Sequence, residues 1–95
     1  MPRRARGVIL LTIYSRPGCH LCDEMKAVVT RTGRSFPIVL EEIDISTDPA
    51  LEARYGLEIP VLVIDGKKVA KYRVTEEELR RILTSRSGGP GGPGG

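Results

Sequence analysis

The stretch Arg16-Pro17-Gly18-Cys19-His20-Leu21-Cys22 holds both cysteines of the chain, three positions apart. It lies between an apolar run and a segment whose apolar residues have helical spacing. On a helix, Cys19 and Cys22 lie on one face, close enough to form a disulfide within a single turn. Cys19 would stand at the helix start, where free backbone N–H groups and the helix dipole stabilise a thiolate. Two neighbouring sulfurs, one of them easily ionised, are what thiol–disulfide exchange requires.

The chain has 95 residues, which is enough for one small domain with a core built mostly of Ile, Leu and Val. Two cysteines cannot form the disulfide-dense framework of a small secreted module, so the pair indicates redox or metal chemistry. We expect a basic N-terminal arm over residues 1–6, one domain over 7–86 and a disordered Gly/Pro tail over 87–95.

The net charge of +3 comes from three arginines within the first six residues. The remaining basic and acidic side chains balance at twelve each, which argues against a nucleic-acid-binding face. The apolar run over 8–14 is too short to cross a bilayer, and no small-residue cleavage site follows it. We therefore expect a cytoplasmic protein with no membrane or nucleic-acid partner, and we expect it to be a monomer.

The periodicity of the apolar residues predicts the element order β-α-β-α-β-β-α. A strand, a helix and a second strand open the chain, so these two strands should be parallel. Asp65-Gly66 has the composition of a type I′ hairpin turn, and Thr75 with Glu78 forms a capping box before the last helix. We predict an α/β domain with a four-stranded mixed sheet flanked by three helices. Its strands should cover 8–14, 36–45, 61–64 and 67–72, and its helices 19–32, 49–55 and the segment after Thr75.

Three motifs in this order resemble the thioredoxin fold and, within it, the glutaredoxins and glutaredoxin-like proteins. They are Ile13-Tyr14-Ser15-Arg16-Pro17-Gly18-Cys19-His20-Leu21-Cys22, then Glu42-Ile43-Asp44-Ile45, then residues 55–66 with Ile59-Pro60 inside. The similarity covers roughly residues 7–84. It implies a dithiol oxidoreductase that reduces protein or glutathione mixed disulfides, with Cys19 as the nucleophile and Cys22 as the resolving thiol. It also implies that Pro60 is cis and faces the cysteines, and that the Ile59 backbone pairs with a bound substrate.

The chain departs from the family pattern where glutaredoxins hold glutathione. The Gly-Gly followed by Asp is replaced by Tyr72-Arg73-Val74-Thr75. Arg16 or Arg73 could instead contact a glutathione carboxylate, and N–H groups after Thr75 could assist. No bound cofactor is expected. The electron source is either glutathione, as a co-substrate, or thioredoxin reductase.

His20 and the cysteine pair each leave alternatives open. A protonated His20 would stabilise a Cys19 thiolate, or its ring is simply exposed at the helix start. The cysteines could also be metal ligands, but zinc needs more ligands than the chain offers, because it has no further His or Cys. A dimer could hold an iron–sulfur cluster with glutathione as co-ligand. A donor dedicated to one partner, such as a ribonucleotide reductase, would share the same chemistry.

Overall fold

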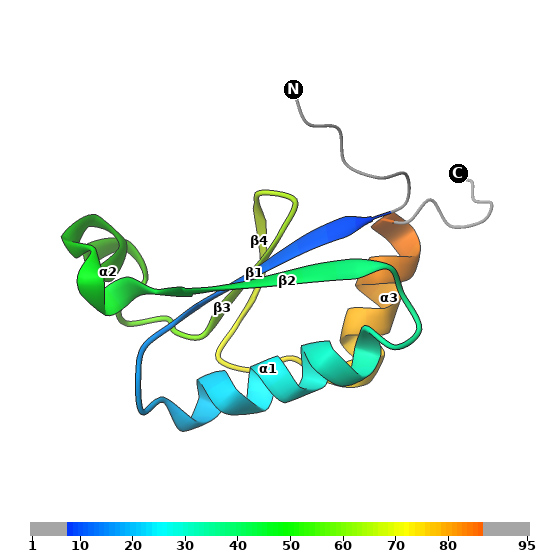
Figure 1. The fold of residues 1–95 in the computed structure, drawn as a ribbon, viewed down its shortest axis with the longest axis horizontal. Coiled ribbons are helices and arrows are strands. Elements are labelled where there is room, and N and C mark those ends of the chain that lie inside the picture. Colours follow the sequence, from blue (N-terminus) through cyan, green and yellow to red (C-terminus); the bar gives the residue numbers. More distant parts are fainter. Residues whose placement is uncertain (1–7, 87–95) are drawn as a thin grey trace.

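A four-stranded mixed sheet with three α-helices makes up the structure, a computed structural model that describes residues 8–86 (Figure 1). The predicted α/β order is confirmed, with one short 3₁₀ helix added after the second strand. The expected basic arm over 1–6 and the Gly/Pro tail over 87–95 lie outside the described residues. The elements are β1 (Ile9–Ser15), α1 (His20–Thr32), β2 (Ile38–Asp44), η1 (Ile45–Thr47), α2 (Pro49–Tyr55), β3 (Val61–Ile64), β4 (Lys67–Lys71) and α3 (Glu76–Arg86).

The strands lie in the order β2-β1-β3-β4. β1 and β2 are parallel, as expected for two strands joined through α1, whereas β3 pairs antiparallel with both β1 and β4. Asp65 and Gly66 have φ angles of 49° and 86°, which agrees with the predicted hairpin turn. One row of register partners crosses the whole sheet through Ile43, Tyr14, Val61 and Lys71. The residues just after β1 and β4 and just before β3 therefore lie at the same end of the sheet.

The strand ends differ from the predicted ones by one or two residues. β2 begins two residues later and ends one residue earlier, because Ile45 turns into η1, where its side chain is fully buried. β1 is shifted by one residue toward the C-terminus. β4 ends one residue earlier because Tyr72 has a φ of 70°, which lies outside the β region.

The start of α3 follows the local signal in the sequence, whereas the end of α1 does not. The capping box of α3 is present: the Glu78 N–H donates to Thr75 Oγ1 and the Thr75 N–H donates to Glu78 Oε1, both at 3.0 Å. The bond from the Thr75 N–H to the carboxylate is the main cause that holds the pKa of Glu78 below its usual range. From the sequence, a glycine directly after the helix predicted over 19–32 suggests a left-handed helix stop, but Gly33 ends α1 with a φ of −63°. A Cβ there would lie 2.9 Å from Ile38 Cδ1, so a larger residue at this position requires the Ile38 side chain to shift.

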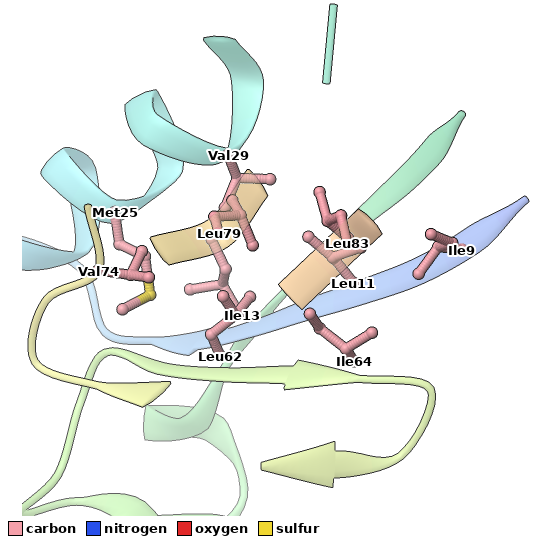
Figure 2. Close-up of a cluster of buried hydrophobic side chains, with 10 residues drawn as sticks. All are labelled: Ile9, Leu11, Ile13, Met25, Val29, Leu62, Ile64, Val74, Leu79 and Leu83. Atoms are coloured by element: carbon pink, nitrogen blue, oxygen red, sulfur yellow. The ribbon is translucent and has the colours of Figure 1, made fainter. Parts of the chain in front are cut away.

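The hydrophobic core lies between one face of the sheet and the two longer helices. Figure 2 shows that side chains of α1 and α3 face those of β1 and β3. α2 has no buried residue and lies at the end of the sheet where β2 finishes (Figure 1). Within residues 8–86, no helix has the length and apolar content needed to cross a bilayer. The core consists of Ile9, Leu11, Ile13, Met25, Val29, Leu62, Ile64, Val74, Leu79 and Leu83.

Candidate active site

Three loops meet at the end of the sheet marked by the row from Ile43 to Lys71. They are the β1–α1 loop (residues 16–19), the α2–β3 loop (56–60) and the β4–α3 loop (72–75). The Tyr72 N–H donates to the Pro60 carbonyl at 2.8 Å, which joins the second loop to the third. Figure 1 shows α1 beginning at this same end. The fold thus places the loops that carry the predicted site residues at one end of the sheet, although these loops come from distant parts of the sequence.

The β1–α1 loop is a tight turn that delivers Cys19 to the start of α1. The Cys19 N–H donates to the Arg16 carbonyl at 3.2 Å, which closes a four-residue turn. Pro17 and Gly18 occupy its two central positions, and Gly18 has a φ of 79°. Proline followed by a residue with positive φ is the signature of a type II turn, and glycine adopts that φ without steric cost. The Pro-Gly pair therefore fixes where the helix starts.

Cys19 and Cys22 form a disulfide, with their Cα atoms 5.2 Å apart. Cys19 is the N-cap of α1, and its sulfur accepts the Cys22 N–H at 3.1 Å. Ser, Thr, Asp or Asn usually supplies this acceptor, so here a reactive sulfur has taken the structural role of a cap. Cys22 is only 2% exposed, whereas Cys19 is half-buried. Of the two cysteines, Cys19 is therefore the more exposed.

The Ile59-Pro60 peptide bond is cis, as the resemblance implied. Pro60 is fully buried and Ile59 is half-buried. Pro60 directly precedes Val61, which pairs with Tyr14 of β1, and Tyr14 lies two residues before Arg16. The loop that carries Cys19 therefore follows β1, and the cis-proline loop precedes the neighbouring strand β3, at the same end of the sheet.

The other predicted site residues differ in how strongly they are held. Arg16 forms an ion pair with Glu52 of α2. The backbone N–H and side-chain hydroxyl of Thr75 are both used by the capping box. Arg73 is exposed, and no acidic side chain among residues 8–86 pairs with it. His20 is exposed on the first turn of α1, next to the half-buried Cys19.

A pocket of about 300 Å³ lies beside Cys22, between the β1–α1 loop and the end of β2. Glu42 Oε2 accepts the Ser15 hydroxyl at 3.0 Å, and Glu42 Oε1 accepts Lys26 Nζ at 2.9 Å. The bond from Lys26, more than that from Ser15, holds the pKa of Glu42 below its usual range. Glu42 is thus a carboxylate at neutral pH. The pocket is lined by Ser15, Arg16, Pro17, Gly18, Cys22, Asp23, Glu42 and Asp44.

Sequence reasoning missed three contributors to this region: Tyr72, Glu52 and Glu42. Besides its backbone bond to Pro60, Tyr72 donates its hydroxyl to the Leu57 carbonyl at 3.0 Å. Neither contact has a local sequence signal, because both join the loops before β3 and after β4. Glu52 pairs across 36 positions with Arg16, so it too is found only in the folded chain. Glu42 belongs to the Glu42–Ile45 motif that carries the family resemblance. The alternation of polar and apolar residues in β2 does not show that Glu42 contacts Ser15 and Lys26.

Metal ligation is an alternative use of the two sulfurs. Within residues 8–86, no group of three or more His, Cys, Asp or Glu side chains is placed to hold a metal ion. In this structure both sulfurs are joined to each other.

Comparison with known proteins agrees with this geometry. The family model "Glutaredoxin-like domain (DUF836)" matches residues 10–84. A glutaredoxin-like protein of Dictyostelium discoideum, the YDR286C homolog, is 31% identical over 77 residues, which are 75% of this chain and 71% of that protein. The X-ray structure of XcR50 from X. campestris has a TM-score of 0.68 at 33% identity and covers 79% of this chain and 96% of that one. A mutant thioredoxin from Halobacterium salinarum has a TM-score of 0.63 at 24% identity, over 83% and 74% of the two chains.

The fold and the paired cysteines define a thioredoxin-fold protein with a redox-active dithiol. The chain belongs to the glutaredoxin-like (DUF836) domain family. A C-x-x-C pair on this fold indicates a function in thiol–disulfide redox chemistry.

Proposed function

We propose that this protein is a dithiol oxidoreductase that reduces disulfides of proteins or mixed disulfides of glutathione. Cys19 is the nucleophile and Cys22 is the resolving thiol. The protein acts as a cytoplasmic monomer with no bound cofactor, and it takes its electrons from glutathione or from a thioredoxin reductase.

The reaction is two successive thiol–disulfide exchanges. The Cys19 thiolate attacks one sulfur of the substrate disulfide and bonds to it, and the other substrate sulfur leaves as a thiolate that takes up a proton. Cys22 then loses its proton and attacks Cys19 Sγ, which forms the Cys19–Cys22 disulfide and releases the second substrate sulfur as a thiol. The substrate gains two electrons and two protons, and the external reductant later restores the dithiol.

One observation carries this proposal: the Cys22 N–H is aimed at Cys19 Sγ from the first turn of α1, at 3.1 Å. This donor and the dipole of α1 both favour negative charge on Cys19 over its protonated form. The greater exposure of Cys19 lets a substrate disulfide reach it, while Cys22 stays behind it. The two cysteines therefore have the different surroundings that attack and resolution need.

Reduction of insulin, followed by turbidity with dithiothreitol as the reductant, tests the assignment. Cys19→Ser is expected to abolish acceleration of this reaction. Cys22→Ser still performs the first exchange, so it should trap a mixed disulfide with the substrate that intact-mass spectrometry detects. Equal rates for wild type and Cys19→Ser contradict the proposal.

The electron source is tested by comparing turnover with glutathione plus glutathione reductase against turnover with thioredoxin reductase plus NADPH. The role of His20 is tested separately, through the pH dependence of Cys19 alkylation in the Cys22→Ser background. Loss of a stabilising histidine in His20→Gln should move the alkylation profile to higher pH. An unchanged profile removes His20 from the mechanism.

A further inference from the structure

The pocket beside Cys22 presents more negative than positive charge to an incoming disulfide. Among the described residues that line it, Arg16 is the one cation. Its lining also holds three carboxylates, those of Asp23, Glu42 and Asp44. Lys26 neutralises Glu42 through an ion pair at 2.9 Å, but Lys26 itself does not line the pocket. A substrate carboxylate that enters this pocket therefore depends on Arg16 for a partner.

The guanidinium of Arg16 is already paired within the chain. It forms an ion pair with Glu52 of α2, and both residues are half-buried, where salt screens a pair less than at full exposure. A Cβ on Gly56 would lie 3.3 Å from Arg16 Nη2, so the guanidinium lies against the end of α2. Hydrogen bonds from Ser46 lower the pKa of Asp44, and the charge of Arg16 lowers it further. Arg16 thus lies between two carboxylates of its own chain.

Arg16 is also close to the nucleophile through its backbone. Its carbonyl accepts the Cys19 N–H at 3.2 Å and so closes the turn before α1. Its side chain lines the pocket that Cys22 also lines. If Glu52 and a substrate carboxylate compete for the guanidinium, the competition therefore takes place beside the two cysteines.

Other donors at this end of the sheet do not replace Arg16. The Thr75 and Glu78 N–H groups at the start of α3 are used by the capping box. Arg73 lines a different pocket, between α1 and the β4–α3 loop, and Glu24 lines that pocket too. An anionic substrate at the dithiol therefore gains little from either group.

We propose that Glu52, acting through Arg16, sets the charge selectivity of the dithiol. Glu52 withholds the Arg16 guanidinium from substrate carboxylates, so disulfides with neutral or cationic groups beside the sulfur are reduced in preference to anionic ones such as glutathione disulfide. Glu52 is a positioning residue, since it acts through Arg16. An anionic substrate must displace Glu52 and leave its carboxylate unpaired, which costs free energy. This inference rests on the proposed function, because it names the substrate class of the same dithiol, and the two exchange steps are unchanged.

Single-turnover oxidation of the reduced full-length chain by three small disulfides tests this selectivity. At neutral pH cystamine is dicationic, bis(2-hydroxyethyl) disulfide is neutral and dithiodipropionate is dianionic. Samples are quenched with iodoacetamide, and the remaining thiols are counted by intact-mass spectrometry. Each rate constant is divided by that of the neutral disulfide, and each variant is then compared with wild type, so the intrinsic reactivities of the probes cancel.

Glu52→Gln removes the charge that holds Arg16 and keeps the size of the side chain. It should raise the relative rate constant for dithiodipropionate about fivefold at about 10 mM salt, where the Debye length is about 30 Å, and by less at about 1 M. The relative constant for cystamine should fall, and that for glutathione disulfide should rise. In an Arg16→Gln background the substitution should lose most of its effect, because no guanidinium is released.

Glu41→Gln is the matched control, since it removes the same charge from an exposed position on β2. Glu41 pairs with Thr12 of β1 and Glu42 with Ile13, so Glu41 points to the face of the sheet opposite the dithiol pocket. Its effect on the relative constant for dithiodipropionate should stay below about twofold, because the charge is removed at a distance from Arg16.

The outcomes separate the two proposals. If none of the three disulfides oxidises the reduced wild type, the proposed function fails. If they do, but Glu52→Gln leaves the relative constant for dithiodipropionate unchanged, the selectivity role of Glu52 is overturned and the function stands. An equal rise in Glu41→Gln overturns it too. So does an equal effect of Glu52→Gln in the Arg16→Gln background, or a rise that is as large at high salt as at low salt.

Discussion

Leu79 and Leu57 lie in opposite environments, so truncating each one tests how burial determines stability. Leu79 is 0% exposed in the core between α3 and the sheet, whereas Leu57 is 93% exposed. The same chemical change, Leu→Ala, should therefore have very different effects on stability. Truncation of a fully buried leucine costs about 2–5 kcal/mol, which adds the lost transfer free energy to the energy of the cavity left behind. An exposed truncation away from special features stays within about 0.5 kcal/mol.

The difference should be visible in urea unfolding of the oxidised protein, followed by far-ultraviolet circular dichroism. A domain of this size has a free energy of unfolding of roughly 4–12 kcal/mol. With an m-value of about 1.5 kcal/mol/M, a loss of about 3 kcal/mol in Leu79→Ala lowers the midpoint by about 2 M. Leu57→Ala should leave the midpoint within about 0.3 M of wild type on the same scale.

A volume-conserving substitution at Leu79 separates the effect of an unfilled core site from the effect of changing the residue type. Leu79→Met should lose less than about 1.5 kcal/mol, because the core site remains filled. A drop of similar size in Leu57→Ala and Leu79→Ala would contradict this prediction, since the Leu57 side chain would then have to be packed in solution. A loss below about 1 kcal/mol in Leu79→Ala would refute it too, because the core described between α1, α3 and the sheet would not depend on this residue.

Three further predictions concern the helix cap, the carboxylate beside Cys22 and the turn before Cys19. Thr75→Ala should lower the free energy of unfolding by about 1 kcal/mol, while Thr75→Ser should stay near wild type. Equal losses for the two variants in urea unfolding would show that the Thr75 hydroxyl does not stabilise α3 as a cap. Lys26 lowers the pKa of Glu42, so the Glu42 contribution to stability is present above the ordinary carboxyl pKa of about 4.3 and is lost as pH falls through the lower folded-state value. Unfolding midpoints of wild type and Glu42→Gln should therefore differ above about pH 5 and converge below about pH 3, and a constant difference across that range contradicts the linkage. Gly18→Ala should cost about 1–2 kcal/mol by calorimetry, because φ is 79° while a Cβ there meets no atom within 4 Å; no loss would mean the turn adopts another conformation.

The parts of the fold that could be predicted are those with a strong local signal. The Asp65-Gly66 turn and the capping box of Thr75 and Glu78 each depend on residues within four positions of one another. The site could be located because the spacing of Cys19 and Cys22 specifies a geometry that any helix supplies.

The parts that could not be predicted are set by contacts between distant segments. The positive φ of Tyr72 is stabilised by bonds to Leu57 and Pro60, and nothing in an alternating strand indicates that it ends there. Arg16 looked available for a substrate carboxylate, but Glu52 in a different helix already pairs with it. Whether side chains on two separate elements pair depends on how those elements are placed relative to each other. The periodicity of a single segment gives no information about that placement.

The use of sulfur as a helix cap gives this protein a built-in reporter. In most proteins the oxidation state of a dithiol must be read from the sulfurs themselves. Here the Cys22 amide donates to Cys19 Sγ, whose partial charge changes when a disulfide becomes a thiolate. The nitrogen and proton chemical shifts of this one amide should therefore follow the redox state of the dithiol continuously, without any label or added dye.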